Sequence, residues 1–128
     1  QSKLLTRVHN ALKDNGVFIF DVVTEYKKAV EDSNISIVNG GFWSPDPYIE
    51  VFNSFLYEEP KTEGLQYTII DEDGDMRVIR IYHRLFSLEE ITEILNKHNF
   101  KVEVVCKNLK GDDLDCESET LGIVARKV

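Results

Sequence analysis

The chain has 128 residues, of which 42% are hydrophobic and 30% are charged. This composition is typical of one folded domain and excludes a disordered chain. The 23 acidic residues outnumber the 15 basic ones and give a formal net charge of −8, so neither nucleic acid nor an anionic membrane surface is expected as a partner. No run approaches the roughly 20 apolar residues of a membrane helix, no signal peptide is visible, and we expect a cytoplasmic protein. The chain begins with Gln1 and not with Met, which is consistent with a processed or excised piece.

No metal site is predicted. Cys106 and Cys116 are ten positions apart and belong to no CxxC pair, so two free thiols are expected. The acidic run Asp71–Asp75 is interpreted as a hairpin turn. A calcium loop of the EF-hand type needs Gly at its sixth position and Glu at its twelfth, where this chain has Met76 and Tyr82.

The first 32 residues predict a helix, a strand and a short helix. Apolar residues recur at helical spacing from Leu4 to Leu12 and predict a helix over about 3–15, ended by Gly16. The continuous apolar run Val17–Val22 is typical of a strand covered on both faces, as in parallel sheets. A short helix is predicted over Thr24–Asp32.

The middle of the chain changes to an antiparallel pattern from Ile35 onward. Strands are predicted over Ile49–Tyr57, Leu65–Ile70 and Met76–Phe86. Asp73-Gly74, between the last two of these strands, is a strong hairpin signal.

The C-terminal part predicts a helix and two closing strands. Ser87-Leu88-Glu89-Glu90 has the form of a capping box, and Asn99 suits the left-handed position that ends a helix. Strands are predicted over Lys101–Lys107 and Thr120–Lys127, separated by the acidic loop 111–119. We interpret the chain as one unit of α/β class (α+β in isolation): 1–34 helix and buried strand, 35–86 antiparallel insertion, 87–128 helix and closing strands.

Three segments resemble class I S-adenosylmethionine-dependent methyltransferases. The segment from Leu4 through Gly16 to Asp21 is similar to the helix and acid-terminated fifth strand of that family, with Asp14-Asn15 where Pro-Gly is usual. The segment 82–100 resembles the family's strand, Ser/Thr-Leu-Glu-Glu phrase and following helix, with Asn99 in place of Gly. Residues 120–127, ending in Ala-Arg-Lys, resemble its antiparallel last strand.

The resemblance implies the C-terminal half of a Rossmann-like methyltransferase sheet with an antiparallel β-meander insertion that forms a lid. The family's Gly-rich cofactor loop has no counterpart here, because Gly40-Gly41 is an isolated pair. The implied cofactor, S-adenosylmethionine, would be bound mainly by the missing N-terminal half, and no residue of this chain is assigned to it. The implied partners are that N-terminal half and a small-molecule methyl acceptor. A homodimer is a further interpretation, because the strand at 17–22 would be exposed without its neighbours and could pair with a second copy.

The candidate site residues come from strand ends, alternation and the resemblance. His83 is the candidate for a base that deprotonates the acceptor, although a packed core histidine is the alternative. Substrate binding is assigned to the strand-terminal Asp21, to Arg80 and Arg84 as anion binders, and to aromatic residues of the insertion. The assigned substrate-binding residues are Asp21, Trp43, Tyr48, Arg80, Tyr82 and Arg84.

Two functions follow from these observations. The first is the substrate-recognition part of a methyltransferase that acts on a small molecule and is inactive without its other half. The alternative is a non-catalytic α+β ligand-binding or dimerisation module.

Overall fold

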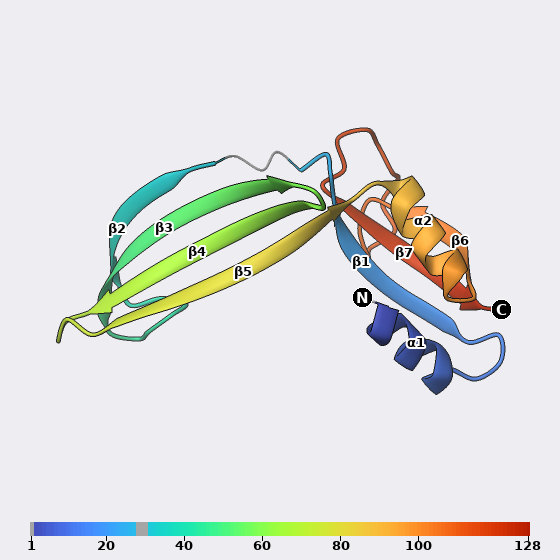
Figure 1. Ribbon diagram of the computed structural model, residues 1–128, viewed down its shortest axis with the longest axis horizontal. Helices are drawn as coiled ribbons and strands as arrows, with labels where there is room; N and C mark the ends of the chain where they lie inside the picture. Colours follow the sequence, from blue (N-terminus) through green and yellow to red (C-terminus); the bar gives the residue numbers. More distant parts are fainter. Residues whose placement is uncertain (1, 28–30) are drawn as a thin grey trace. The chain divides into compact units, whose positions relative to one another are not determined.

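A computed structural model describes residues 2–27 and 31–128, and they form two compact units. The first, here called the helical unit, comprises Gln1–Lys27 and Leu85–Val128, and the second, the meander unit, comprises Lys28–Arg84. Backbone ladders connect the seven strands in the order β2-β3-β4-β5-β1-β7-β6, and strand β5 (Met76–Phe86) contributes residues to both units (Figure 1).

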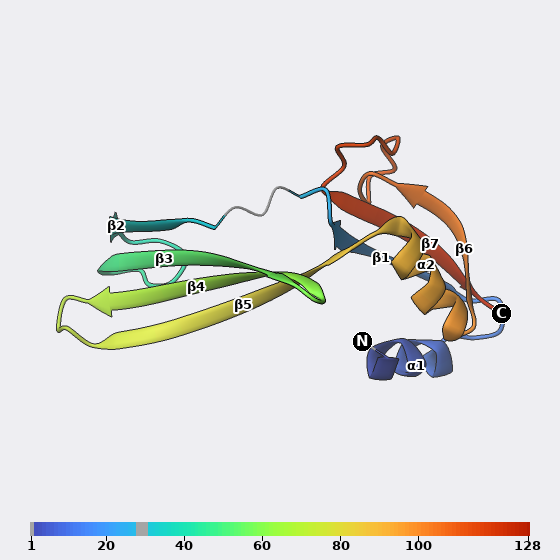
Figure 2. The ribbon, with the colours of Figure 1, turned by 45° about the horizontal axis from the view of Figure 1, so that its top comes forward.

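In the helical unit, two helices pack on one face of a small sheet. The helices are α1 (Ser2–Ala11) and α2 (Leu88–Lys97), and the strands are β1 (Val17–Thr24), β6 (Phe100–Cys106) and β7 (Thr120–Lys127). β7 pairs antiparallel with both β1 and β6, and Val23 and Thr24 of β1 pair parallel with the end of β5. Figure 2 shows β7 between β1 and β6.

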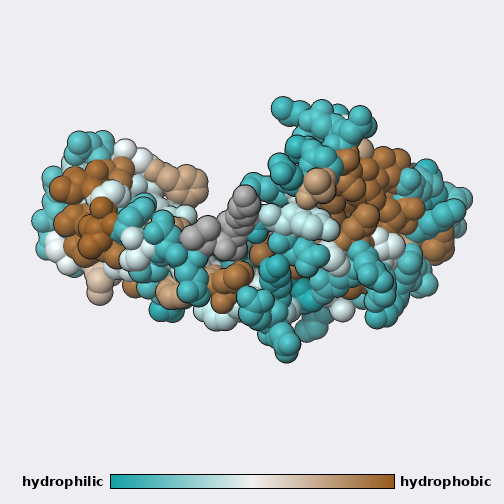
Figure 3. All heavy atoms as spheres, turned by 90° about the horizontal axis from the view of Figure 1, so that it is seen from above, coloured by the Kyte–Doolittle hydropathy of each residue, from teal (hydrophilic) through white to brown (hydrophobic). Residues whose placement is uncertain are grey.

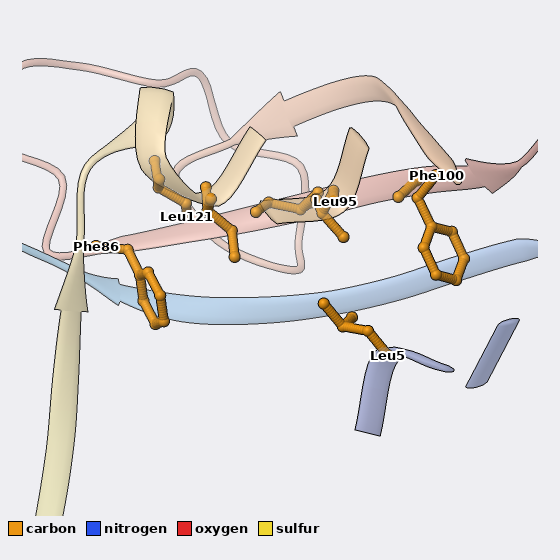
Figure 4. Packing of buried hydrophobic residues seen from close by; sticks show 8 residues of the cluster. Leu5, Phe86, Leu95, Phe100 and Leu121 are labelled. Atoms are coloured by element: carbon orange, nitrogen blue, oxygen red, sulfur yellow. The ribbon is translucent and has the colours of Figure 1, made fainter. Parts of the chain in front are cut away.

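The core of the helical unit lies between these helices and the sheet. Leu95 and Ile123 are fully buried, and Phe100 is almost so. The side chains shown in Figure 4 come from both helices and from the strands beneath them. Alternate residues of β1, Phe18, Phe20 and Val22, pack against the same cluster. The sequence predicts cover on both faces of β1, but Ile19, on the other face, is 61% exposed within the described residues.

Local signals at both ends of α2 are confirmed. The Ser87 hydroxyl accepts a hydrogen bond from the Glu90 amide at 3.0 Å, as a capping residue does. Asn99 follows the helix with φ of 60°, and Phe100 is buried directly after it.

Two helix predictions are corrected. α1 ends at Ala11 and not near 15, and Asn15, with φ of 59°, takes the left-handed turn before β1. The helix predicted over Thr24–Asp32 is wrong at its start, because Thr24 belongs to β1 and residues 25–27 form a turn. Residues 28–30 of that prediction lie outside the described residues.

The meander unit is an antiparallel sheet whose strands follow chain order. Its strands are β2 (Ser33–Asn39), β3 (Pro47–Glu58), β4 (Lys61–Asp71) and the first nine residues of β5. The three predicted strands are confirmed as β3, β4 and β5, with β4 longer than expected. The Asp73-Gly74 turn is confirmed as well, because Gly74 has φ of 85° and its amide donates to the Asp71 carbonyl oxygen.

Candidate functional site

The two faces of the meander sheet carry different side chains. Because successive side chains of a strand point to opposite faces, the uninterrupted ladders from β2 to β5 assign the residues named below to one face or the other. One, here called the Glu63 face, carries Tyr48, Glu50, Phe52, Ser54, Leu56, Glu58, Lys61, Glu63, Leu65, Tyr67, Ile69, Asp71, Arg77, Ile79, Ile81 and His83. The other, the Ile37 face, carries Ile35, Ile37, Ile49, Val51, Asn53, Phe55, Tyr57, Thr62, Gly64, Gln66, Thr68, Ile70, Met76, Val78, Arg80, Tyr82 and Arg84.

A carboxylate and an imidazole meet on the Glu63 face. Glu63 of β4 lies directly opposite His83 of β5, and Oε2 of Glu63 is 3.3 Å from Nδ1 of His83. The Glu63 side chain is only 8% exposed, whereas that of His83 is 37% exposed. A buried carboxylate needs polar partners, and the imidazole is one of them.

The geometry suits a histidine that exchanges protons. When a carboxylate bonds one ring nitrogen, it fixes the tautomer and orientation of the imidazole, and the other nitrogen is left to act on a substrate. Nε2 of His83 has no hydrogen-bond partner within the described part of the chain. His83 was predicted as a base from sequence, while its partner Glu63 was missed.

Aromatic side chains gather further along the same face. The Trp43 ring lies 5.0 Å from that of Tyr67, and the Phe52 ring lies 5.1 Å from Tyr67 on the adjacent strand. Tyr67 lies four positions after Glu63 on β4, which is about 13 Å along a strand. Arg77 of β5 donates to the Trp43 carbonyl oxygen and so holds the loop between β2 and β3 against this face.

Tyr48 lines a pocket at the end of the aromatic cluster. The pocket has a volume of about 310 Å³, and Ser44, Ile69, Asp71 and Arg77 are among its lining residues. Tyr48 itself is 4% exposed. Of the predicted site residues, Trp43, Tyr48 and His83 therefore share the Glu63 face.

The three other predicted residues of β5 lie on the opposite face. Arg80, Tyr82 and Arg84 alternate with His83 and belong to the Ile37 face, as the alternation predicted. Arg80 donates from Nε to the side-chain oxygen of Gln66 at 2.8 Å, and Tyr82 is largely exposed. The sheet thus separates these residues from His83, and one pocket in a single sheet face cannot hold both groups.

Asp21 belongs to the helical unit and does not end its strand, contrary to the sequence prediction. β1 continues to Thr24, and Asp21 lies opposite Gly122 of β7. The buried end of β1 is held by the loop before β7, since Thr24 donates from Oγ1 to the Ser118 carbonyl oxygen at 2.7 Å.

That loop also forms a pocket that sequence reasoning missed. It has a volume of about 290 Å³ and is lined by Tyr26, Leu88, Leu114, Asp115, Cys116, Ser118 and Leu121. Lys107 donates to Asp115 at 2.7 Å. Hydrogen bonds from Lys107, the Glu117 amide and the Ser118 hydroxyl lower the pKa of Asp115. The hydrogen bond between Lys107 and Asp115 also raises the pKa of Lys107. Both side chains are therefore charged at neutral pH, and their ion pair stabilises the loop.

No helix in the described ranges, 2–27 and 31–128, is long and apolar enough to cross a membrane. No family model and no curated protein matches the chain.

Several solved structures match, and the three described here are methyltransferases. The CcbJ methyltransferase from Streptomyces caelestis matches with a TM-score of 0.74 at 13% identity, over 99% of this chain and 49% of that one. An S-adenosylmethionine-dependent methyltransferase from Clostridium acetobutylicum matches with a TM-score of 0.75 at 14% identity, over 98% and 50%. The sugar N-methyltransferase KedS8 from a Streptoalloteichus species matches with a TM-score of 0.63 at 13% identity, over 98% of this chain and 48% of that one.

The chain therefore spans about half the length of each of these proteins. Sequence identities of this size establish a shared fold and not a shared activity. The chain has the α/β fold of the C-terminal half of S-adenosylmethionine-dependent methyltransferases.

Proposed function

We propose that this chain is the C-terminal, substrate-recognition part of an S-adenosylmethionine-dependent methyltransferase that acts on a small molecule in the cytoplasm. The observation that carries the proposal is the fold match, which covers nearly all of this chain and half of each methyltransferase. One of the matched enzymes is titled a sugar N-methyltransferase, which supports a small acceptor with a nucleophilic nitrogen or oxygen.

The described residues do not fit S-adenosylmethionine by themselves. Nucleotide-like cofactors need a Gly-rich turn that leads into a helix N-terminus. Gly40-Gly41 lies instead in the turn between β2 and β3, where the Gly41 amide donates to the Ser44 carbonyl oxygen. At the N-terminus of α2, the Ser87 hydroxyl already accepts from the Glu90 amide. We therefore assign the cofactor mainly to the other half of the protein.

Strand β1 offers a place for that other half. Val17–Val23 pair with β7 on one side, whereas on the other side only Val23 and Thr24 pair with a strand of the described chain. An unpaired edge with apolar side chains invites another strand. A strand from the N-terminal half would satisfy these backbone groups, and its attached helices would cover the exposed Ile19.

The Glu63 face would receive the acceptor. His83, oriented by Glu63, would take a proton from the acceptor nitrogen or hydroxyl as that atom becomes a nucleophile, a role that typically contributes about 10²–10⁴-fold in rate. Trp43, which packs on Tyr67 about 13 Å along β4 from Glu63, would contact the far end of an extended acceptor. Tyr48 lies opposite Asp71, about 26 Å along β4 from Glu63, which is beyond the reach of a small molecule bound at His83. The proton moves to Nε2 of His83, and the resulting positive charge is stabilised by the Glu63 carboxylate.

The experiment uses the protein expressed from its own gene, with whatever sequence flanks residues 1–128. Calorimetry measures S-adenosylmethionine binding, and release of S-adenosylhomocysteine is followed over a panel of amino sugars, amines and phenols. We expect cofactor binding and turnover of at least one acceptor. His83→Asn should lower kcat by about 10²-fold or more without changing cofactor affinity.

His98→Asn is the matched control. His98 is also half-buried, but its Nδ1 lies 2.7 Å from the Ile94 carbonyl oxygen in the helical unit, so its loss should leave kcat within a few-fold. A gene product that binds no S-adenosylmethionine would refute the methyltransferase proposal and favour the non-catalytic module. An unchanged kcat in His83→Asn would refute only the role of His83.

A further inference from the structure

The pocket beside Tyr48, here called the Tyr48 pocket, lies far from the place assigned to the methyl acceptor. Asp71, directly opposite Tyr48, is about 26 Å along β4 from Glu63, so a small molecule bound at His83 leaves the pocket free. Its volume is about 310 Å³, within the range of about 300–1,000 Å³ that is typical of small-molecule sites. The lining residues are Ser44, Tyr48, Ile69, Asp71, Asp75, Met76 and Arg77.

The hydroxyl group of Tyr48 has no use in the fold. Tyr48 is only 4% exposed, yet within the described part of the chain its hydroxyl has no hydrogen-bond partner. The oxygen atom is not fully enclosed, and because Tyr48 lines the pocket, the hydroxyl opens into it. Gly41 leaves room beside this oxygen, since a Cβ at Gly41 would lie 3.0 Å from it. Buried phenol groups usually have a partner, so this hydroxyl is available to a ligand.

The turn between β4 and β5 makes the pocket acidic. Oδ1 of Asp71 accepts the backbone amides of Asp73 and Asp75 at 3.0 and 2.9 Å, which leaves Oδ2 for another donor. The Asp75 carboxylate has no hydrogen bond or ion pair in the ranges that the structure describes. Arg77 is the one basic side chain among the lining residues, and it already donates to the Trp43 carbonyl oxygen. Two carboxylates of the pocket therefore face it with acceptor sites unfilled.

An apolar wall adjoins these charges. Ile69 lies opposite Arg77 and is 2% exposed, and together with the ring of Tyr48 it gives the pocket an apolar side. Figure 3 shows hydrophilic and hydrophobic residues next to one another at the surface of the part of the chain that holds the antiparallel strands. Apolar walls with a few polar groups that converge are the usual composition of a ligand site.

We infer that the Tyr48 pocket binds a small aliphatic amine in its protonated form. The ammonium group would donate to the carboxylates of Asp71 and Asp75 and to the Tyr48 hydroxyl, and hydrogen bonds between charged groups are the strong ones. The alkyl part would contact Ile69. An anion would be repelled by the two carboxylates, and a neutral alcohol would gain no attraction between charges.

This inference does not rest on the methyltransferase proposal. The pocket lies on the same sheet face as His83 but at the other end of the strands, and it would be present in a non-catalytic module as well. Failure of cofactor binding would therefore not bear on the amine, and absence of amine binding would not contradict methyl transfer.

Calorimetry on the protein expressed from its own gene tests the inference. The probes are cadaverine, an aliphatic diamine, and pentanediol, its uncharged analogue of the same length. We expect cadaverine to bind with a dissociation constant below about 1 mM and pentanediol not to bind.

Two variants remove single contacts of the amine. Tyr48→Phe should weaken cadaverine binding about tenfold, because it removes one hydrogen bond to a charged group. Asp75→Asn should weaken it by about as much and should also reduce its dependence on salt concentration. Asp113→Asn is the matched control, since it removes one carboxylate from an exposed position in the helical unit and should leave the affinity unchanged.

Thermal melting separates binding from folding. Because the Tyr48 hydroxyl has no partner within the described residues, Tyr48→Phe should leave the melting temperature unchanged or slightly higher, whereas a hydroxyl that stabilised the fold would lower it on removal. Asp75→Asn keeps the test open if Tyr48→Phe does not fold.

Four results would overturn the inference. One is a wild-type protein that binds no cadaverine up to about 10 mM, and another is an affinity that both folded variants leave within about twofold. Equal binding of pentanediol would contradict the recognition of a cation. Binding that is lost in His83→Asn and kept in Tyr48→Phe would assign the amine to the acceptor site instead.

Discussion

Replacing Leu95 by alanine tests the core of the helical unit quantitatively. Leu95 of α2 is fully buried and belongs to the same cluster as Phe100 and Ile123. Removing three buried carbons costs about 2.4 kcal/mol at about 0.8 kcal/mol each. If the site closes only partly and leaves a cavity of about 60 Å³, the cavity adds about 1.4 kcal/mol. We therefore expect Leu95→Ala to lower the free energy of unfolding by about 4 kcal/mol, within the range of about 2.7–5 kcal/mol for such changes.

Equilibrium urea denaturation, followed by far-ultraviolet circular dichroism, measures this loss. Leu88→Ala is the control, because it makes the same chemical change in the same helix at a side chain that is 39% exposed, and it should cost about 1 kcal/mol or less. Equal losses for the two variants, or a loss below about 1.5 kcal/mol for Leu95→Ala, would refute the packing of α2 described above.

Two further predictions concern the loop between β6 and β7. In Gly122→Ala, the new Cβ would lie 2.4 Å from the Asn108 carbonyl oxygen, so the variant should lose about 1–3 kcal/mol, measured by the same denaturation, and amide exchange near Asn108 should rise. Because the pKa of Asp115 is lowered in the folded state, its contribution is complete at neutral pH and is lost as the pH falls through the ordinary carboxyl range and below. The protection of the Glu117 and Ser118 backbone amides from hydrogen exchange should therefore be greater in the wild type than in Asp115→Asn at neutral pH, and this difference should shrink toward low pH. A ratio of the two proteins' protection factors that does not change with pH would contradict the role of the Lys107 contact.

Elements defined by neighbouring residues were predictable from the sequence. The Ser87 cap, the left-handed Asn99 and the Asp73-Gly74 turn depend on side chains and φ angles within one or two turns of chain. All three are found in the structure. Strand β7 was predicted with its observed bounds.

Elements decided by distant contacts were not predictable. The Leu12 carbonyl group, directly after α1, receives its hydrogen bond from a residue near the C-terminus, because Lys127 donates from Nζ to the Leu12 carbonyl oxygen at 2.9 Å. β1 extends to Thr24 because the Thr24 amide donates to the Glu119 carbonyl oxygen at 2.9 Å. Helical spacing alone carries no information about either partner.

The candidate site was predictable in part. The alternation of side chains along the strand predicted that His83 lies on the opposite face of the sheet from Arg80, Tyr82 and Arg84, and the pairing of β4 with β5 confirms this prediction. Glu63 was missed although a signal existed. The Asp73-Gly74 turn sets Ile70 opposite Met76, and counting outward from that pair brings residue 63 opposite residue 83. A hairpin register counted from its turn would thus have found the carboxylate.

Two groups of exposed apolar residues in the described chain, one on β1 and one on the Ile37 face, differ in the partner that each can accept. β1 presents an unpaired backbone edge together with Ile19, so its partner must supply a strand, which the other half of a doubly wound sheet does. On the Ile37 face the central strands are already paired on both sides, so a partner can only pack on the side chains, as a second sheet does. The continuous apolar run of β1 therefore suits pairing with a further strand, whereas the alternating pattern of β2–β5 leaves one apolar face for side-chain packing.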